Sequence, residues 1–211
     1  MSYRSESFLM AGETLKKAFA RHGMDACYCA TAEEAKEKIL SIIPEGSSVT
    51  WGGTESMMEA GVIEAVKQGN YEVIDRKSAK TPEEARALYG KIVCADYFLT
   101  STNAFTKDGM LVNIDGASNR VACIAHGPAH VIVLASMDKM CDNVEDAVRR
   151  IRTLASPPNA VRVNVQTPCA KTGVCGDCLS PECICCQILV TRYSRVPGRI
   201  TVVLCGEKLG F

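Results

Sequence analysis

The alternation of short apolar runs with segments of helical periodicity is the feature that most constrains the fold. The runs predict strands over residues 48–51, 71–75, 97–100, 110–114, 121–125, 131–135, 161–165 and 200–204. Apolar residues at helical spacing predict helices over 5–22, 31–43, 57–66, from 81 onward and over 143–154. Strands that alternate with helices form βαβ units. The sequence therefore predicts an α/β fold of the three-layer type, with a mostly parallel sheet covered on both faces.

Capping residues support several of these helix boundaries. Thr31 precedes a helix whose Glu34 stands in capping-box position, and Thr81 precedes Pro82 at a first helical position. The pair Pro157-Pro158 is expected to end the helix over 143–154. We expect a single domain over residues 1–211, with the segment 169–186 as a loop inserted within it.

Charge and hydropathy exclude several classes of protein. Lys+Arg and Asp+Glu are equal at 24 each, whereas a nucleic-acid binder needs a basic surface to neutralise phosphates. The same balance gives no reason to expect an anionic membrane surface as partner. The N-terminus is polar, and no apolar stretch is long enough to insert into a membrane. These observations predict a cytoplasmic protein.

The cysteines form the most specific chemical signal. The chain has 12, which in the cytoplasm are not expected to form disulfides. Cys175 and Cys178 have the spacing of a metal knuckle. With Cys169 and one of Cys183, Cys185 or Cys186, they would form a four-thiolate site for an iron–sulfur cluster or, alternatively, zinc. A Cys-x-x-Cys redox pair is a third interpretation, but the usual strand-to-helix setting is missing.

A glycine loop follows the strand predicted over 48–51. Its residues Gly52, Gly53, Thr54 and Ser56 lie between that strand and a helix. Glycines let the backbone approach a ligand, and a helix N-terminus presents free N–H groups to an anion. The loop lacks the Gly-Lys-Ser/Thr of a Walker A motif. A tight turn with Thr54 as cap explains the same residues equally well.

Polar residues gather in the middle of the chain, near strands expected to be buried. Asp108-Gly109 between two apolar runs is typical of a hairpin. Asn103, Asp115, Asn119 and Arg120 need polar partners near a core, and a ligand pocket at the C-terminal ends of strands would supply them.

A histidine follows the strand predicted over 121–125. At a strand end His126 would face the same crevice, where it and Asp115 are the candidate catalytic residues. A hydrogen-bonded histidine at a turn is an equally good interpretation.

Together these motifs resemble the lactate-utilization (LUD) domain family. The segments that carry the resemblance are 103–109, 113–122, 126–128, 144–151, the cysteine segment, 197–200 and 206–211. The family usually has cysteines at the positions of Cys169, Cys175, Cys178 and Cys185. It often has a basic residue and an asparagine where this chain has Cys183 and Cys186. The fourth ligand therefore stays open.

The resemblance implies the three-layer α/β fold shared with ribose-phosphate isomerases, glucosamine-phosphate deaminases and CoA transferases. The glycine loop would then lie where those relatives bind phosphate or a cofactor. The implied role is an accessory subunit of a lactate-oxidising system, with electron transfer through an iron–sulfur centre. Other subunits of that system and a small-molecule ligand would be its partners, and a homo-oligomer is expected from general frequency alone. The alternative is an enzyme that binds a phosphorylated or CoA-linked small molecule.

Overall fold

A computed structural model describes residues 2–211. Its helices are α1 (Tyr3–Arg21), α2 (Ala32–Ile42), α3 (Glu55–Glu59), α4 (Val62–Gln68), α5 (Pro82–Val93), α6 (Asn119–Ala125), α7 (Val144–Arg150), α8 (Ser156–Arg162) and α9 (Pro168–Thr172), with short helical turns η1 (Arg76–Ser78), η2 (Met137–Lys139) and η3 (Ile151–Ala155). Its strands are β1 (Asp25–Cys29), β2 (Ser48–Trp51), β3 (Glu72–Ile74), β4 (Tyr97–Ser101), β5 (Ala104–Thr106), β6 (Leu111–Asp115), β7 (His130–Ser136), β8 (Met140–Cys141), β9 (Gln187–Thr191) and β10 (Ile200–Cys205).

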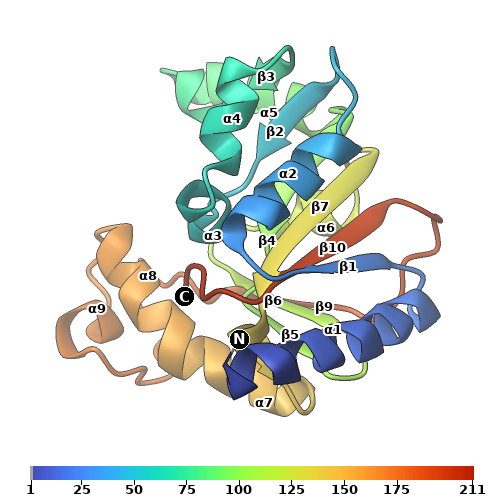
Figure 1. Cartoon of the computed structure of the whole chain (residues 1–211). Helices are drawn as coiled ribbons and strands as arrows, with labels where there is room; N and C mark the ends of the chain where they lie inside the picture. The colour runs from blue at the N-terminus through green and yellow to red at the C-terminus, as the bar shows by residue number, and fades with distance from the viewer. Residues whose placement is uncertain (1) are drawn as a thin grey trace.

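A six-stranded sheet forms the centre of the molecule (Figure 1). Its strand order is β1-β10-β7-β4-β2-β3, and every neighbouring pair is parallel. The predicted α/β fold with a mostly parallel sheet is therefore confirmed. Parallel strands place their C-terminal ends at one edge, so the segments after β2, β4 and β7 meet there.

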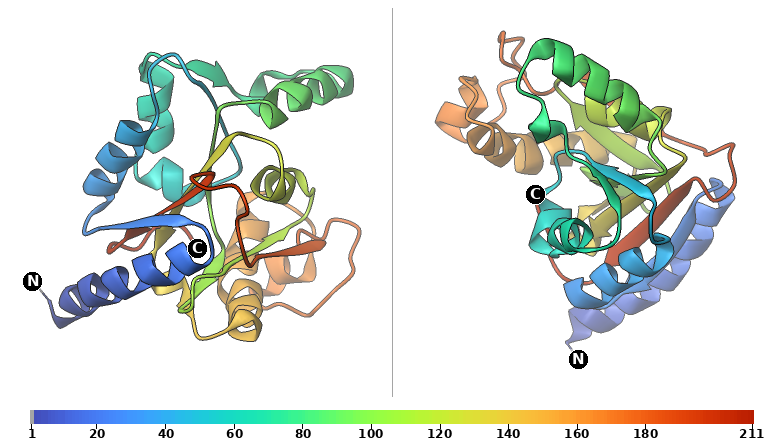
Figure 2. Two further views of the ribbon diagram at one scale, coloured as in Figure 1. Left: turned by 90° about the vertical axis from the view of Figure 1, so that its right-hand side faces the viewer. Right: turned by 90° about the horizontal axis from the view of Figure 1, so that it is seen from above.

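Helices cover both faces of this sheet (Figure 2). Side chains of β7 alternate between the faces: Val131 and Val133 pack with α1, α5 and α6, whereas Ile132 and Leu134 pack with α2, α3 and α4. A strand buried on both faces has apolar residues at successive positions rather than at every second one. This arrangement explains the unbroken apolar run of β7.

A second, four-stranded sheet has the order β8-β5-β6-β9. The hairpin predicted around Asp108-Gly109 joins β5 and β6, which pair antiparallel. One side of this sheet contributes Phe105 and Leu111 to the core under α1, and the other packs Val112 and Ile114 against α7 and η3.

Two predicted strands are wrong. Residues 119–125 form the helix α6, in which Val121 and Ile124 are buried one turn apart. A short apolar run does not by itself distinguish a strand from a helix. Residues 161 and 162 end the helix α8, and Val161 is exposed.

The expected stop at Pro157-Pro158 is wrong as well. These prolines lie at the start of α8, directly after the π-helical turn η3, where the regular α-helical hydrogen-bond pattern is already interrupted. The π-helical turn η3 connects α7 to α8, so the helical path continues past them (Figure 1). Within residues 2–211, no helix has the length and apolar character needed to cross a bilayer.

Candidate functional site

Three adjoining hollows lie where β2 and β4 of the parallel sheet and β6 of the second sheet end. Their volumes are about 80, 310 and 320 Å³. The residues predicted to bind a ligand line them: Gly52, Gly53, Thr54, Ser56, Asn103, Asp115, Asn119 and Arg120. Arg120 borders all three hollows, which together are called the crevice below.

Arg120 occupies the centre of the crevice wall, and its guanidinium is fully engaged. Its Nη atoms donate to Asn113 Oδ1 (2.7 Å), Asn103 Oδ1 (2.9 Å), Ile114 O (2.8 Å) and Ser101 O (3.3 Å). Its Nε lies 3.4 Å from Asp115 Oδ2. These partners use all five N–H donors of the side chain. Arg120 therefore holds the wall together rather than offering a donor to a ligand.

Asp115 is also committed to local structure. Its Oδ1 accepts hydrogen bonds from the backbone N–H groups of Ala117 (3.1 Å) and Ser118 (3.0 Å), and its Oδ2 pairs with Arg120. The carboxylate thus stabilises the turn that starts α6. This geometry gives no support to the catalytic role expected for Asp115.

The two loop glycines allow basic side chains to approach the backbone. A Cβ on Gly52 would meet the Arg120 Cγ at 3.1 Å, and one on Gly53 would lie 3.5 Å from the Arg76 guanidinium and 3.9 Å from that of Arg162. Thr54 caps α3, as expected, by accepting from the N–H of Met57. Because α3 has only five residues, the anion site expected at its N-terminus has little helix dipole behind it.

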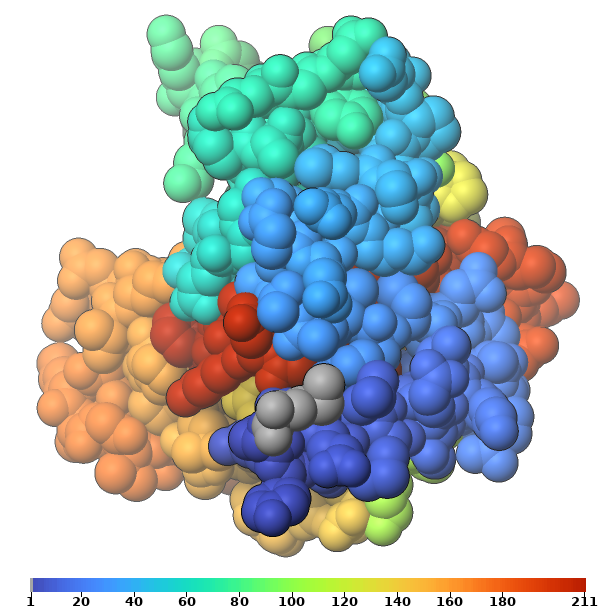
Figure 3. Space-filling view, in the orientation of Figure 1, coloured from blue at the N-terminus to red at the C-terminus, as the bar shows by residue number. Residues whose placement is uncertain are grey.

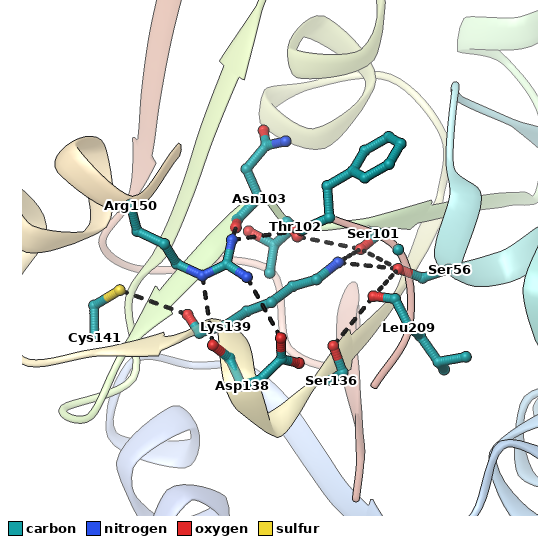
Figure 4. A network of polar contacts seen from close by, with 12 residues as sticks. Ser56, Ser101, Thr102, Asn103, Ser136, Asp138, Lys139, Cys141, Arg150 and Leu209 are labelled. Atoms are coloured by element: carbon teal, nitrogen blue, oxygen red, sulfur yellow. Dashed lines mark hydrogen bonds and ion pairs between the residues drawn. The ribbon is translucent and has the colours of Figure 1, made fainter. Parts of the chain in front are cut away.

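A lysine that the sequence analysis did not single out lies at the bottom of the crevice. Lys139 is 3% exposed, and its Nζ donates to Ser56 Oγ (3.0 Å) and Ser101 Oγ (3.2 Å), as Figure 4 shows. The neighbouring Asp138 pairs with Arg150 instead, at 3.7 Å. No salt bridge within residues 2–211 includes Lys139.

Burial lowers the pKa of Lys139 to about 8, and the positive charge of Arg150 adds to the effect. Removal from water disfavours the ammonium form, and two hydroxyl partners do not replace a carboxylate. The lysine therefore exchanges its proton near neutral pH. A sequence signal does exist, because Lys139 comes shortly after the apolar run that forms β7.

The segment after β10 closes one side of this lysine site. Leu209 O accepts hydrogen bonds from Ser56 Oγ (3.1 Å) and Ser136 Oγ (3.2 Å), and Gly210 N donates to Glu59 Oε2 at 2.6 Å. In Figure 3 this segment reaches the surface between α3 and α8. The first and last thirds of the chain thus meet at Ser56.

His126 lies outside the crevice. It is exposed at the C-terminal end of α6 and borders a different hollow, together with residues of β9 and the segment before β10. The expectation that it faces the crevice depended on a strand over 121–125, and the helix directs the chain elsewhere. A catalytic role for His126 has no support from this position.

The cysteine segment encloses a cavity of its own, of about 60 Å³. Cys169, Cys175, Cys178 and Cys185 all line it, and Cys183 is a fifth thiol on its wall. All five are free thiols. Cys186 is exposed, does not border the cavity, and donates its thiol to Cys183 O at 3.1 Å. The geometry therefore favours Cys183 over Cys186 as the rival fourth ligand.

The thiols are not arranged as a closed single-metal site. Within residues 2–211, no three His, Cys, Asp or Glu side chains are close enough together to hold one metal ion. Several thiols hydrogen-bond to hydroxyls instead, Cys169 to Thr167 and Cys185 to Ser156, both at 3.3 Å. Burial and the neighbouring thiols raise the pKa of Cys185. Four thiolates are the donor set of an iron–sulfur cluster or of zinc, so the side-chain chemistry of the segment fits either group.

Comparisons with known proteins identify a family model and solved structures that are similar to this chain. The family model described as "LUD domain" matches residues 12–205. A DUF162 family protein from Deinococcus radiodurans is 13% identical and superposes with a TM-score of 0.55, over 98% of this chain and 100% of that one. At this identity the likeness shows the fold alone. None of the curated proteins matches the sequence.

Two other solved structures share smaller parts of the chain. Ribose 5-phosphate isomerase A from Neisseria gonorrhoeae is 15% identical, with a TM-score of 0.36 over 55% of this chain and 56% of that one. The eIF2B delta of Chaetomium thermophilum is 18% identical, with a TM-score of 0.35 over 51% and 46%.

Proposed function

The chain belongs to the LUD-domain family, and from that premise we propose that it binds a small organic anion in the crevice, as a component of lactate utilization. The observation that carries the proposal is the buried ammonium of Lys139, which has hydroxyl partners but no carboxylate partner in residues 2–211. A buried charge without a counterion is costly. A bound carboxylate or phosphate would supply the missing negative charge.

The charges around the crevice support the same conclusion. Its walls carry five basic side chains and two acidic ones: Arg76, Lys77, Arg120, Lys139 and Arg162 against Glu55 and Asp115. Asp115 pairs with Arg120, and Glu55 pairs with Arg162 at 2.9 Å. The remaining Arg76, Lys77 and Lys139 form no salt bridge within the described part of the chain. Their field favours an anionic ligand.

Size distinguishes two ligand classes. The hollow beside Lys139 is about 80 Å³, which suits a small carboxylate such as a 2-hydroxy acid. The two adjoining hollows, at about 310 and 320 Å³, give room for the rest of a phosphorylated or CoA-linked molecule. The family supports the 2-hydroxy acid, and the adjoining hollows support the larger ligand.

Ligand-dependent thermal unfolding tests the proposal, because a ligand that binds only the folded protein raises its apparent stability. L-lactate, pyruvate, ribose 5-phosphate, CoA and inorganic phosphate are the probes. We expect one class to raise the melting temperature of the wild type and to lose that effect in Lys139→Met. The control Lys17→Met removes an exposed lysine of α1 and should respond like the wild type. No stabilisation by any of these anions would contradict the proposal.

Electron transfer through the cysteine segment is the second candidate function. Five thiols around one cavity favour it, since all-thiolate sites suit iron–sulfur clusters. Ile184 borders both this cavity and the crevice, so a centre held there would be adjacent to a ligand bound in the crevice. A cluster would supply one-electron chemistry, and Cys169, Cys175, Cys178 and Cys185 would hold it.

Anaerobic purification tests this second candidate. Iron, acid-labile sulfide and zinc are measured per chain, together with the visible spectrum. Iron with matching sulfide is the expected result. Zinc alone would make the segment a structural metal site, and metal-free protein with all thiols titratable would contradict both.

A further inference from the structure

Three side chains at the bottom of the crevice form a closed triangle of polar contacts. Lys139 Nζ lies 3.0 Å from Ser56 Oγ and 3.2 Å from Ser101 Oγ, and the two hydroxyl oxygens are 3.2 Å apart (Figure 4). Ser56 follows the glycine loop, Ser101 ends β4, and Lys139 ends η2 after β7. All three border the same hollow, so a molecule in it meets all of them.

We propose that Ser56 is a nucleophile that Lys139 activates, with Ser101 as proton relay, and that the crevice accepts an acyl ester or thioester bearing an anionic group. A serine becomes nucleophilic when a base removes its proton within hydrogen-bond distance. Serine–lysine pairs perform this chemistry on unrelated folds. The basic walls of the crevice select the anionic group of the substrate.

The reaction proceeds in two balanced steps. Neutral Lys139 Nζ takes the Oγ proton, directly or through Ser101, while Ser56 Oγ bonds to the carbonyl carbon. The tetrahedral intermediate then breaks its bond to the alkoxide or thiolate, which leaves with the proton from Lys139. In the second step Lys139 takes a proton from water while the water oxygen bonds to the acyl carbon. The bond to Ser56 Oγ then breaks, and Lys139 returns the proton to Oγ. The sum is ester or thioester plus water to carboxylic acid plus alcohol or thiol.

The surroundings of the triangle support these roles. Lys139 forms no ion pair within residues 2–211, so no carboxylate is in direct contact with its Nζ atom. Ser56 Oγ donates its single proton to Leu209 O at 3.1 Å, so the hydroxyl must rotate toward Lys139 before the base can take that proton. Ser136 donates to the same carbonyl at 3.2 Å but has no hydrogen bond with Lys139, whose Nζ donates to Ser56 and Ser101. The protein therefore contains a matched serine that lacks the base.

Three charged groups from neighbouring elements and one from its own turn act on Lys139. Arg150 from α7 and Arg120 from α6 lower its pKa, while Asp138 from η2 and Glu59 from α3 raise it. Burial is the largest cause, and the pKa is about 8. Because neutral lysine is the base, the rate of the serine reaction should rise with pH and level off above about pH 8.

An alkyl fluorophosphonate tests the proposal directly on the intact wild-type chain. Its phosphorus accepts a bond from an activated serine Oγ, and fluoride leaves with the displaced proton. We expect one adduct per chain, located on Ser56 by peptide mass spectrometry, with a labelling rate that follows the pH profile above. Lys139→Met should slow labelling by about 100-fold or more, the usual range for loss of a general base. Ser101→Ala should slow it less.

Lys17→Met removes an exposed lysine of α1, far from the triangle in the sequence, and is the control that should label at the wild-type rate. No adduct on Ser56 of the folded wild type would overturn the proposal, and so would equal labelling rates in the wild type and Lys139→Met. The first of these outcomes is measured on the wild type, so it does not depend on whether a variant folds. The inference rests on the proposed function only for the location of the crevice. If anions stabilise the protein but Ser56 is not labelled, the covalent chemistry fails and anion binding stands.

Discussion

Gly116 and Ile184, far apart in the sequence, are in backbone contact: a Cβ on Gly116 would lie 2.9 Å from the Cα of Ile184. The nearby N–H of Cys186 donates to Asp115 O at 3.0 Å. The end of the cysteine segment is therefore fastened to the turn between β6 and α6, which forms part of the crevice wall. Through this contact the two candidate sites share one structural element.

Gly116→Ala is expected to destabilise the protein by about 1–3 kcal/mol, because the new methyl group meets backbone rather than a movable side chain. Urea unfolding followed by circular dichroism measures the change. Gly90→Ala is the control: it lies within α5 with nothing within 4 Å of an added Cβ, so it should gain up to about 1 kcal/mol from helix propensity. Equal effects at both sites would contradict the close contact.

The stability of the protein should rise with pH between about 8 and 10.5, because the pKa of Lys139 is lowered from 10.5 to about 8 in the folded state. In that range the unfolded chain binds the proton more tightly, and stability increases wherever the unfolded state holds more protons. The gain is roughly 3 kcal/mol at about 1.4 kcal/mol for each pH unit. The measurement is the unfolding free energy of the wild type minus that of Lys139→Met. A difference that does not change with pH would refute the lowered pKa.

Arg120→Lys should cost roughly 2–4 kcal/mol although it keeps the charge, since an ammonium cannot reach the acceptors that the guanidinium holds in one plane. Asn103 and Asn113 each lose a partner in the wall. Thermal unfolding measures the effect. Arg149→Lys, on the exposed side of α7, is the control and should change stability by less than about 0.5 kcal/mol. A mild effect at position 120 would show that the wall does not depend on this residue.

The amount of iron bound per chain should differ between variants of the cysteine segment. Cys185→Ser replaces a thiol on the cavity wall and should lower the iron bound per chain after anaerobic purification, whereas Cys186→Ser replaces an exposed thiol outside the cavity and should not. Cys183→Ser tests the rival ligand. Loss of iron in Cys186→Ser alone would show that the segment rearranges around its metal.

The position of the crevice followed from the sequence, because the segments after parallel strands converge at one edge of a sheet. The glycine loop and the polar residues around Arg120 lie at such positions. The burial of Lys139 in the crevice was not predicted from the sequence. A lysine in a short turn is normally exposed, and here only tertiary packing buries it. His126 was misplaced because five apolar residues fit a strand and a helix equally well.

The strands β1, β5, β8 and β9 were not predicted, and for β1 and β9 the reason is related. β1 contains Asp25 and two cysteines, and β9 follows the cysteine segment with two of its five residues exposed, so neither has a clear strand pattern. Each is at an edge of its sheet and depends on a single neighbour, β10 for β1 and β6 for β9. Their structure comes from pairing over long sequence distances, which local patterns do not reveal.

The pairing of β1 with β10 also determines the order in which the chain can assemble. β10 is the last strand in the sequence, yet it lies between β1 and β7 in the sheet. During synthesis from the N-terminus, α1 and β1 must wait for nearly the whole chain before they can join the sheet. Within residues 2–211, β1 has no other partner strand, so it cannot enter the sheet until β10 has been made. Chains dominated by such long-range pairings fold slowly, and the segments that wait for their partners are exposed to aggregation in the meantime.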